Sequence, residues 1–377
     1  MARRLLREPV PAAPRAGSPR AASAVATLLL LSCTGSFAAP RTPAPQLAVP
    51  PADHDPVVGP AELWSGHAHF DADPAFSFPH VFRAENEETL SENSSFFANG
   101  KFYLYYREID GKNVARIALA TSTDGDRFKR VQHVLDGPPE TVDAYSPGVV
   151  YRNGTVYMVY EARKSGSMPD VYLATSTDFV TFQRKGLLVP HDPSVFWESV
   201  NTGTPSLNFY FDRWFVWYHG WRGPNAIAEL FRGFAVTSEP GAPLSRPTLS
   251  RFASPALYPG EPGSWDGVGI GHADVLSDGA HLYMVYEGAS GAATCDEKHH
   301  GRYGWGVARS ADFTSWTKFA GNPIAHSPTG CGVAMPSWFF DPNRRKLGVI
   351  YTGRHGGLHR AWLVAGPPSA SNRVELD

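Results

Sequence analysis

The sequence predicts an all-β protein, a five-bladed β-propeller, over residues 61–366. Five short segments rich in aromatic and β-branched residues support this prediction, because each has strand-forming composition and each ends in a tyrosine. The tyrosines recur at intervals of 54, 58, 68 and 65 residues, as Tyr106, Tyr160, Tyr218, Tyr286 and Tyr351. Repeats of this length are typical of small sheets arranged in a ring, since one such sheet cannot bury both of its faces alone.

Each repeat is expected to contain a hairpin, followed by a further strand. Asn-Gly turns at 98–101 and 152–155 precede the first two segments, and this dipeptide is the strongest short hairpin signal. Ser-Asp-Gly at 277–279 and Asp-Pro-Asn at 341–343 take its place in the last two repeats. The third strand ends in a small-x-Ser-x-Asp pattern, whose aspartates (Asp124, Asp178 and Asp312) we assign to a turn. A long β-sandwich is the alternative, which the regular spacing disfavours.

Composition excludes several classes of protein. The chain has 377 residues, 42% of them hydrophobic, which is enough for a full core. Its 34 basic and 36 acidic residues leave a net charge of −2, so the electrostatic footprint of a nucleic-acid-binding protein is missing. The 36 glycines and 33 prolines indicate many turns and argue against a coiled coil.

Residues 1–39 have the pattern of a signal peptide, with an arginine-rich start and an apolar run at 24–31 that is too short to span a membrane. Ser36-Phe37-Ala38 offers one cleavage site. Leu30-Leu31-Ser32-Cys33 offers another, because it resembles a bacterial lipobox in which Cys33 would carry a lipid. We therefore expect a secreted protein or a cell-envelope lipoprotein, with membrane contact only through that anchor. A Pro/Ala-rich tether is expected over 40–60, and a C-terminal tail over 367–377.

The chain contains three cysteines. If Cys33 is lipidated or removed, Cys295 and Cys331 remain, and an oxidising compartment would let them form a disulfide. Two unpaired thiols are the alternative.

The repeats resemble the five-bladed glycosidases of glycoside hydrolase families 43, 62, 32, 68, 117 and 130. The resemblance rests on the hairpins and on the Ala-x-Ser-x-Asp-x-x-x-Phe/Trp strand ends. Tyr145-Ser146-Pro147 is similar to the Trp-Ala-Pro of family 43, and Trp217-Tyr218-His219-Gly220 to the Tyr-His-Gly of family 130. The likeness covers roughly 61–366.

The resemblance implies that two sets of residues surround the mouth of the central channel. The first set lies fourteen residues before each terminal tyrosine: Glu92, Ser146, Thr204, His272 and Ser337. The second set follows each tyrosine: Arg107, Glu108, Glu161, Arg163, His219, Trp221, Glu287, Thr352 and Arg354. Family 43 enzymes place a base, a pKa-tuning acid and a proton donor on blades one, three and four. Here those positions hold Glu92, Thr204 and His272, so the acid of blade three is missing.

Glycoside hydrolysis with inversion needs one base and one proton donor. Glu92 is the expected base. His272, held protonated by Asp274 or another carboxylate, is the expected donor, as a histidine is in family 117, and Glu287 is its rival. Asp143 or Glu198 would tune that donor. The expected catalytic set is Glu92, His272, Asp143 and Glu287, and the expected substrate-binding set is Arg107, Glu161, Arg163, Glu198, His219, Trp221, Asp274 and Arg354.

Each assignment has a structural alternative. Glu92 could be a surface charge, Asp143 a turn cap and His272 a structural histidine or, by the family resemblance, a neighbour of a calcium ion in the channel. The arginines could form a structural ring with Glu108, Glu161 or Glu287.

The expected function is an exported glycoside hydrolase that cleaves a polysaccharide or oligosaccharide and requires no cofactor. A family 130-like mannoside phosphorylase or hydrolase, or a non-catalytic glycan-binding propeller, is the alternative.

Overall fold

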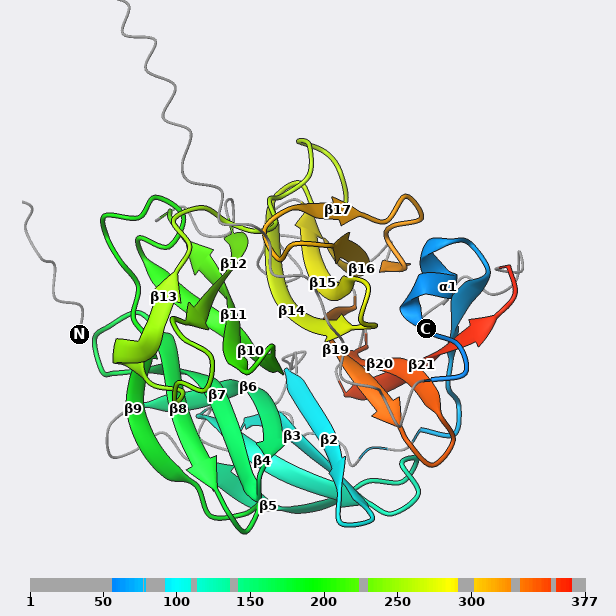
Figure 1. Cartoon of the computed structure of the whole chain (residues 1–377), viewed down its shortest axis with the longest axis horizontal. Helices are drawn as coiled ribbons and strands as arrows, with labels where there is room; N and C mark the ends of the chain where they lie inside the picture. Colours follow the sequence, from blue (N-terminus) through cyan, green and yellow to red (C-terminus); the bar gives the residue numbers. More distant parts are fainter. Residues whose placement is uncertain are drawn as a thin grey trace, which may run out of the picture. The chain divides into compact units, whose positions relative to one another are not determined.

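A computed structural model describes residues 56–76, 78, 92–109, 114–135, 142–223, 230–290, 302–326, 333–353 and 357–367. Cys33, Cys295, Cys331 and Arg354 lie outside these ranges, as do the expected signal peptide and most of the expected tether and tail. The described part is almost entirely β-structure, and its antiparallel sheets form the five blades that the repeats predict (Figure 1).

Each of the first three blades is built from consecutive strands, in order from the centre of the ring to its rim. Blade one contains β2 (Asn93–Ala98), β3 (Lys101–Ile109), β4 (Ala115–Ser122) and β5 (Lys129–Leu135). Blade two contains β6 (Asp143–Arg152), β7 (Thr155–Arg163), β8 (Asp170–Ser176) and β9 (Gln183–Val189). Blade three contains β10 (Asn201–Tyr210), β11 (Arg213–Trp221), β12 (Leu230–Thr237) and the short β13 (Leu249–Arg251), which follows a 3₁₀ turn at Arg246–Thr248.

Blade four contains β14 (Gly269–Ser277), β15 (Leu282–Ser290), β16 (Arg302–Ser310), β17 (Trp316–Lys318) and β18 (Ala325–His326). A parallel pair between Leu230 and Gly269 joins it to blade three. Blade five contains β19 (Ala334–Asp341), β20 (Lys346–Thr352) and β21 (Leu358–Ala365). Its outer strand is β1 (Ala68–Ala72), which comes from the start of the described chain.

The N-terminal segment thus completes the last blade, and this arrangement is absent from the sequence-based expectation. The short helix α1 (Pro60–Trp64) precedes β1, and Leu63 packs in the core between blades four and five. Val57 N donates a hydrogen bond to the carbonyl of Arg345 at 2.9 Å, so residues 56–60 of the expected tether contact the blade. No helix in the described ranges has the length and apolar character needed to cross a membrane.

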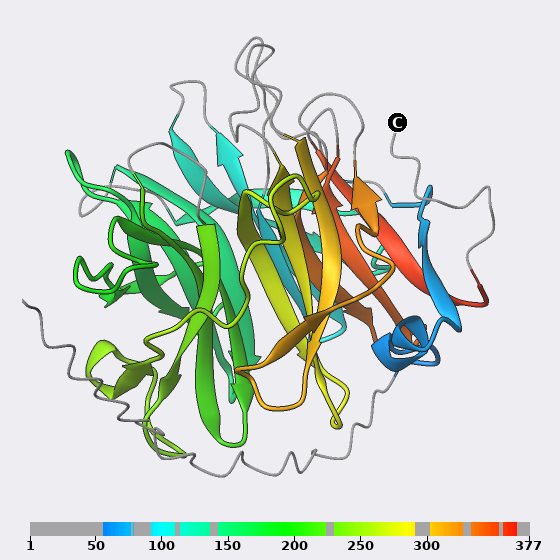
Figure 2. The same ribbon diagram turned by 90° about the horizontal axis from the view of Figure 1, so that it is seen from above.

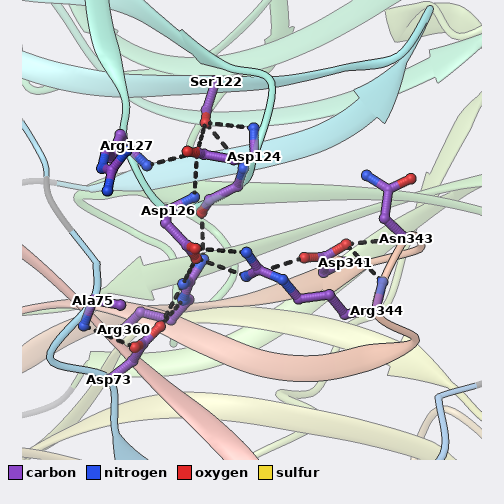
Figure 3. Close-up of polar contacts among 11 residues, drawn as sticks. Asp73, Ala75, Ser122, Asp124, Asp126, Arg127, Asp341, Asn343, Arg344 and Arg360 are labelled. Carbon is purple, nitrogen blue, oxygen red and sulfur yellow. Dashed lines mark hydrogen bonds and ion pairs between the residues drawn. The ribbon is translucent and has the colours of Figure 1, made fainter.

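A cluster of arginines and aspartates closes the ring between blades five and one (Figure 3). Arg360 of β21 is fully buried and bonds Asp73, just after β1, and Asp126, in the β4–β5 hairpin, where the latter contact measures 2.6 Å. Arg344 of the β19–β20 hairpin makes a bidentate contact with Asp126 at 2.5 and 2.7 Å. These contacts join three segments that are far apart in the sequence.

The repeated Ser-x-Asp motif forms a turn, as predicted. In three blades the serine hydroxyl donates to the aspartate at 2.8, 2.9 and 3.2 Å, and the carboxylate accepts two backbone N–H groups that follow it. The five terminal tyrosines are buried and pack in the aromatic clusters within and between blades. In Figure 2 the green and yellow strands of blades three and four run between the two faces of the ring.

Candidate functional site

The inner strands of blades two to five share an irregularity near the end where they begin. Each shows a register shift against its neighbour: Tyr145/Gly148, Gly203/Ser206, Ile270/Ala273 and Ala334/Ser337. Ser146, Thr204 and Met335 lie within these bulges with φ of 51°, 38° and 55°, a left-handed conformation that costs energy for residues other than glycine. Bulges re-aim backbone groups at sites of function, and here they free N–H groups at the mouth of the channel.

Two glutamates use these freed N–H groups in the same way. Glu161 directly follows the terminal tyrosine of blade two, and its carboxylate accepts Thr204 N of blade three at 2.6 Å. Glu287 has the same place in blade four and accepts Met335 N of blade five at 3.0 Å. Glycines leave room for both, because a Cβ on Gly203 or Gly271 would come within 2.5 Å of Glu161 or 2.3 Å of Glu287.

Glu92 lies between these two carboxyl groups. Arg107 pairs with it at 3.1 Å and lies over the ring of Tyr145 at 5.6 Å from its centre. The Tyr145 hydroxyl in turn bonds Glu161. On the other side, the neighbouring Asn93 donates to the carbonyl of Met335 at 3.3 Å. Blades one, two, four and five therefore meet around Glu92, which is 2% exposed.

Two of these carboxyl groups, Glu161 and Glu287, have raised pKa values. Burial raises the pKa of Glu161 to about 7, with a further contribution from the nearby Glu92, against the lowering effect of Thr204 N. Burial likewise raises the pKa of Glu287 to about 8, and Glu92 adds to this shift while Met335 N opposes it. At neutral pH Glu287 therefore holds a proton, and Glu92 is the carboxyl group that pairs with the Arg107 guanidinium.

The two mouth histidines are neutral. Burial lowers the pKa of His219 to about 3, and Nδ1 of its ring bonds the Thr204 hydroxyl at 2.7 Å. Burial and the Arg232 cation place the pKa of His272 well below its usual value, and Nε2 of that ring contacts the Ser337 hydroxyl at 3.1 Å. This environment therefore favours neutral His272, whereas the mechanism expected from the sequence needs His272 to be protonated.

Asp274, the expected partner of His272, points elsewhere. Its carboxylate accepts a hydrogen bond from Trp338 N at 3.0 Å and another from the N–H of the next residue, Val275, at 2.9 Å. It lines a cavity of about 550 Å³ further along the channel, to which the inner strands of all five blades contribute. Burial raises the pKa of Asp274 to about 6.

Other expected site residues have partners of their own. Asp143 pairs with Arg163 at 2.6 Å and accepts Ala115 N, so it links blades one and two. Glu198 is 1% exposed and pairs with Arg251 of β13 at 2.9 Å. The same arrangement, a buried carboxylate with a cation from the outer strand, recurs as Glu108–Arg130 and Asp266–Lys318. This recurrence indicates a structural role for Glu198, so we do not retain it as a substrate contact.

Arg232 of β12 is a residue that the sequence did not single out. Its guanidinium is fully buried and donates to the carbonyls of Thr204 and Ala273, each at 2.7 Å, so it joins the inner strands of blades three and four. Burial lowers its pKa to about 9. Only knowledge of strand pairing places this arginine beside the mouth, so no sequence signal identifies it.

The described residues include no group of three His, Cys, Asp or Glu side chains arranged as metal ligands. Calcium takes six to eight oxygen ligands, usually with carboxylates, whereas His272 has a serine as its polar contact. The residues around His272 do not fit the calcium ion that the family resemblance offers as an alternative, and we derive no step through one.

Comparison with known proteins connects this fold to solved structures at low identity. No known sequence family matches the chain, and no curated protein matches it. A thermostable family-43 glycoside hydrolase superposes with a TM-score of 0.56 at 17% identity, covering 78% of this chain and 92% of that one. A family 117 glycoside hydrolase of Zobellia galactanivorans gives 0.54 at 14%, covering 79% and 91%. The β-1,2-mannobiose phosphorylase of Listeria innocua gives 0.53 at 12%, covering 79% and 96%. The chain thus has the five-bladed propeller fold found in these glycoside-active enzymes.

Proposed function

We propose that this protein is a glycoside hydrolase that cleaves a polysaccharide or oligosaccharide with inversion, using Glu92 as the base and Glu287 as the proton donor. The observation that carries the proposal is that a glutamate paired with a guanidinium and a glutamate that retains its proton lie at one channel mouth. Arg107 pairs with Glu92 at 3.1 Å, while burial raises the pKa of Glu287 to about 8. Two carboxyl groups, one that accepts a proton and one that donates a proton, are the usual basis of glycoside hydrolysis.

In the proposed reaction a water molecule attacks the anomeric carbon as the bond from that carbon to the leaving oxygen breaks. Glu92 accepts a proton from the water, and Glu287 gives its proton to the leaving oxygen. The products are two sugar hydroxyl compounds, and the new anomeric hydroxyl has the opposite configuration. Solvent then carries a proton from Glu92 to Glu287, which restores the starting state.

The phosphorylase alternative receives less support from the mouth. That alternative rests on the structural similarity to the mannobiose phosphorylase and on the segment Tyr218-His219-Gly220 of this chain. Phosphate binding needs cationic donors, yet Arg107 and Arg163 are each paired with a carboxylate here. His219 has one ring nitrogen on Thr204 and the other 3.4 Å from Asn201. Export, which we continue to propose from the N-terminal sequence, also favours water over phosphate as the acceptor.

The test is sugar release by the purified protein from arabinan, xylan, fructan, mannan and agar oligomers, with and without phosphate. Release in phosphate-free buffer, with inverted anomers seen first by proton NMR, is the expected result. Retained configuration would contradict the proposed roles of Glu92 and Glu287. Release only with phosphate would identify a phosphorylase, and binding without release a glycan-binding propeller.

A further inference from the structure

An exposed aromatic cluster lies on blade three, outside the carboxyl site. Phe196 and Tyr258 are 49% and 48% exposed, among the most exposed large hydrophobic side chains of the described residues. Both contact the buried Phe231 edge to face, with ring centres 5.8 and 5.9 Å from its own. The Arg222 guanidinium lies 6.0 Å from the Phe196 ring centre and 5.8 Å from that of Phe231. We call Phe196, Phe231 and Tyr258, with Arg222, the aromatic platform.

The backbone beneath the platform is firmly held. Trp197, which follows Phe196, is fully buried against Gly220 and Gly233. Its indole N–H donates to the carbonyl of Ala253 at 3.1 Å. Leu257, which precedes Tyr258, is also buried and forms a β-bridge with Arg232. Two large rings therefore remain in water although their neighbours in the chain are anchored in the core, which is the arrangement of a preformed contact surface.

The aromatic platform lies at the end of blade three that is nearer the carboxyl site. Phe231 is near the start of β12, the end of that strand closest to the mouth, because β12 runs antiparallel to β11. The next residue, Arg232, bonds the carbonyl of Thr204, whose N–H bonds Glu161. β12 is two strands outward from β10 (Figure 1), roughly 10 Å at the usual strand spacing.

We propose that the aromatic platform is a sugar-binding subsite for a unit of the glycan beyond the bond that is cleaved, so the substrate is a chain and not a disaccharide. This inference rests on the proposed function and names its substrate class. Aromatic side chains with an accessible face can pack against the C–H face of a sugar ring. A guanidinium held over the rings supplies hydrogen bonds to sugar oxygens. Because the platform lies outward from the inner strand of blade three, whereas Glu92 and Glu287 belong to blades one and four, we place it at a unit further along the chain.

The test is the double variant Phe196→Ala, Tyr258→Ala. Affinity gels containing arabinan, xylan or mannan measure binding independently of cleavage, and a series of oligosaccharides of increasing length measures KM and kcat. The matched control is Phe252→Ala. Phe252 is an exposed aromatic residue of the same blade, and its ring packs on Phe234 with ring centres 4.2 Å apart. Phe234 is three positions further from the mouth along β12 than Phe231. Thermal unfolding verifies that both variants fold.

We expect at least one polysaccharide gel to retard the natural protein and the control variant. The double variant should bind the same polysaccharide about tenfold more weakly. KM should rise for long oligosaccharides and stay unchanged for the shortest, with kcat little altered. Retardation without any cleavage would support the platform while overturning the proposed hydrolysis. Three results would each overturn the platform as a subsite. The first is an equal effect on long and short substrates, and the second is no retardation of the natural protein by any of the polymers. The third is a sedimentation result in which the double variant only loses self-association.

Discussion

Two clusters of carboxylates and arginines in this propeller have opposite electrostatic consequences. At the seam between blades five and one, Arg344 and Arg360 surround Asp126, and their hydrogen bonds and charges lower the pKa of that carboxyl group. At the mouth, Arg107 pairs with Glu92, and burial raises the pKa of both Glu161 and Glu287. The two regions differ in burial and in the hydrogen bonds that cations donate: burial is the largest cause at Glu161 and Glu287, and the hydrogen bond from Arg344 is the largest at Asp126.

This difference separates a stabilising cluster from a reactive one. A carboxylate whose charge is neutralised by a guanidinium stays ionised and contributes to stability, whereas a buried one that meets another carboxylate retains its proton. Groups perturbed in the second way are typical of active sites. The strained bulge residues Thr204 and Met335 also lie on the mouth side of this comparison.

The largest expected effect is on catalysis. Glu92→Gln and Glu287→Gln should each lower kcat by about 10²–10⁴, because each removes proton transfer while keeping shape and hydrogen-bond acceptors. Glu239→Gln, at an exposed position after β12, is the matched control and should leave kcat unchanged. Initial rates on the substrate found in the panel measure the effect. If Glu287→Gln keeps most of the natural rate, Glu287 is not the proton donor.

The second prediction breaks the seam. Arg360→Met should lower the free energy of unfolding by about 3 kcal/mol, because it removes a fully buried guanidinium and leaves Asp73, whose side chain is 8% exposed, without its cation. Arg344→Met, at a side chain that is 37% exposed, should cost less than about 1 kcal/mol. Urea unfolding compares the two variants. Equal losses would show that burial does not distinguish the two arginines.

The sequence contains enough information for the fold but not for the site. The spaced tyrosines and the Ser-x-Asp turns predict five blades, because these local patterns determine where strands and turns occur. It does not predict that β1 completes blade five, since that pairing joins residues nearly 300 positions apart. Glu92 and Glu287 could be named from their positions in the repeats. The protonation of Glu287 and the neutrality of His272 depend on burial and on N–H groups freed by bulges, which only the folded chain reveals.

The third prediction concerns pH. Glu287 titrates near pH 8 in the folded protein, and its ordinary value is 4.5. As the proton donor it should make kcat fall as pH rises through about 8. Because the folded pKa lies above the unfolded one, the stability associated with this proton is complete below about pH 4.5 and is lost progressively up to about pH 8.

Glu287→Gln removes that loss. The melting temperature of this variant should therefore match the natural protein at pH 4 and exceed it at pH 9, where the buried carboxylate is ionised. Calorimetry across this range checks the sign. A variant that is less stable than the natural protein at pH 9 would mean that the Glu287 carboxylate is stabilising and that its pKa is not raised.

The smallest expected effect comes from substitutions in the repeated turns. These substitutions also compare the turn that contacts the seam with the equivalent turns of other blades. Ser122, Ser176 and Ser310 occupy equivalent positions, and each hydroxyl bonds its own aspartate. Replacing any one by alanine should cost about 1 kcal/mol, the usual value of such a hydrogen bond. The Ser122 hydroxyl also accepts Gly125 N at 2.9 Å, and the carbonyl of Gly125 accepts Arg360 of the seam. Urea unfolding should therefore show a larger loss for Ser122→Ala than for Ser176→Ala, because the first substitution loosens an acceptor of a buried cation. Equal losses would mean that the seam holds the β4–β5 turn without help from Ser122.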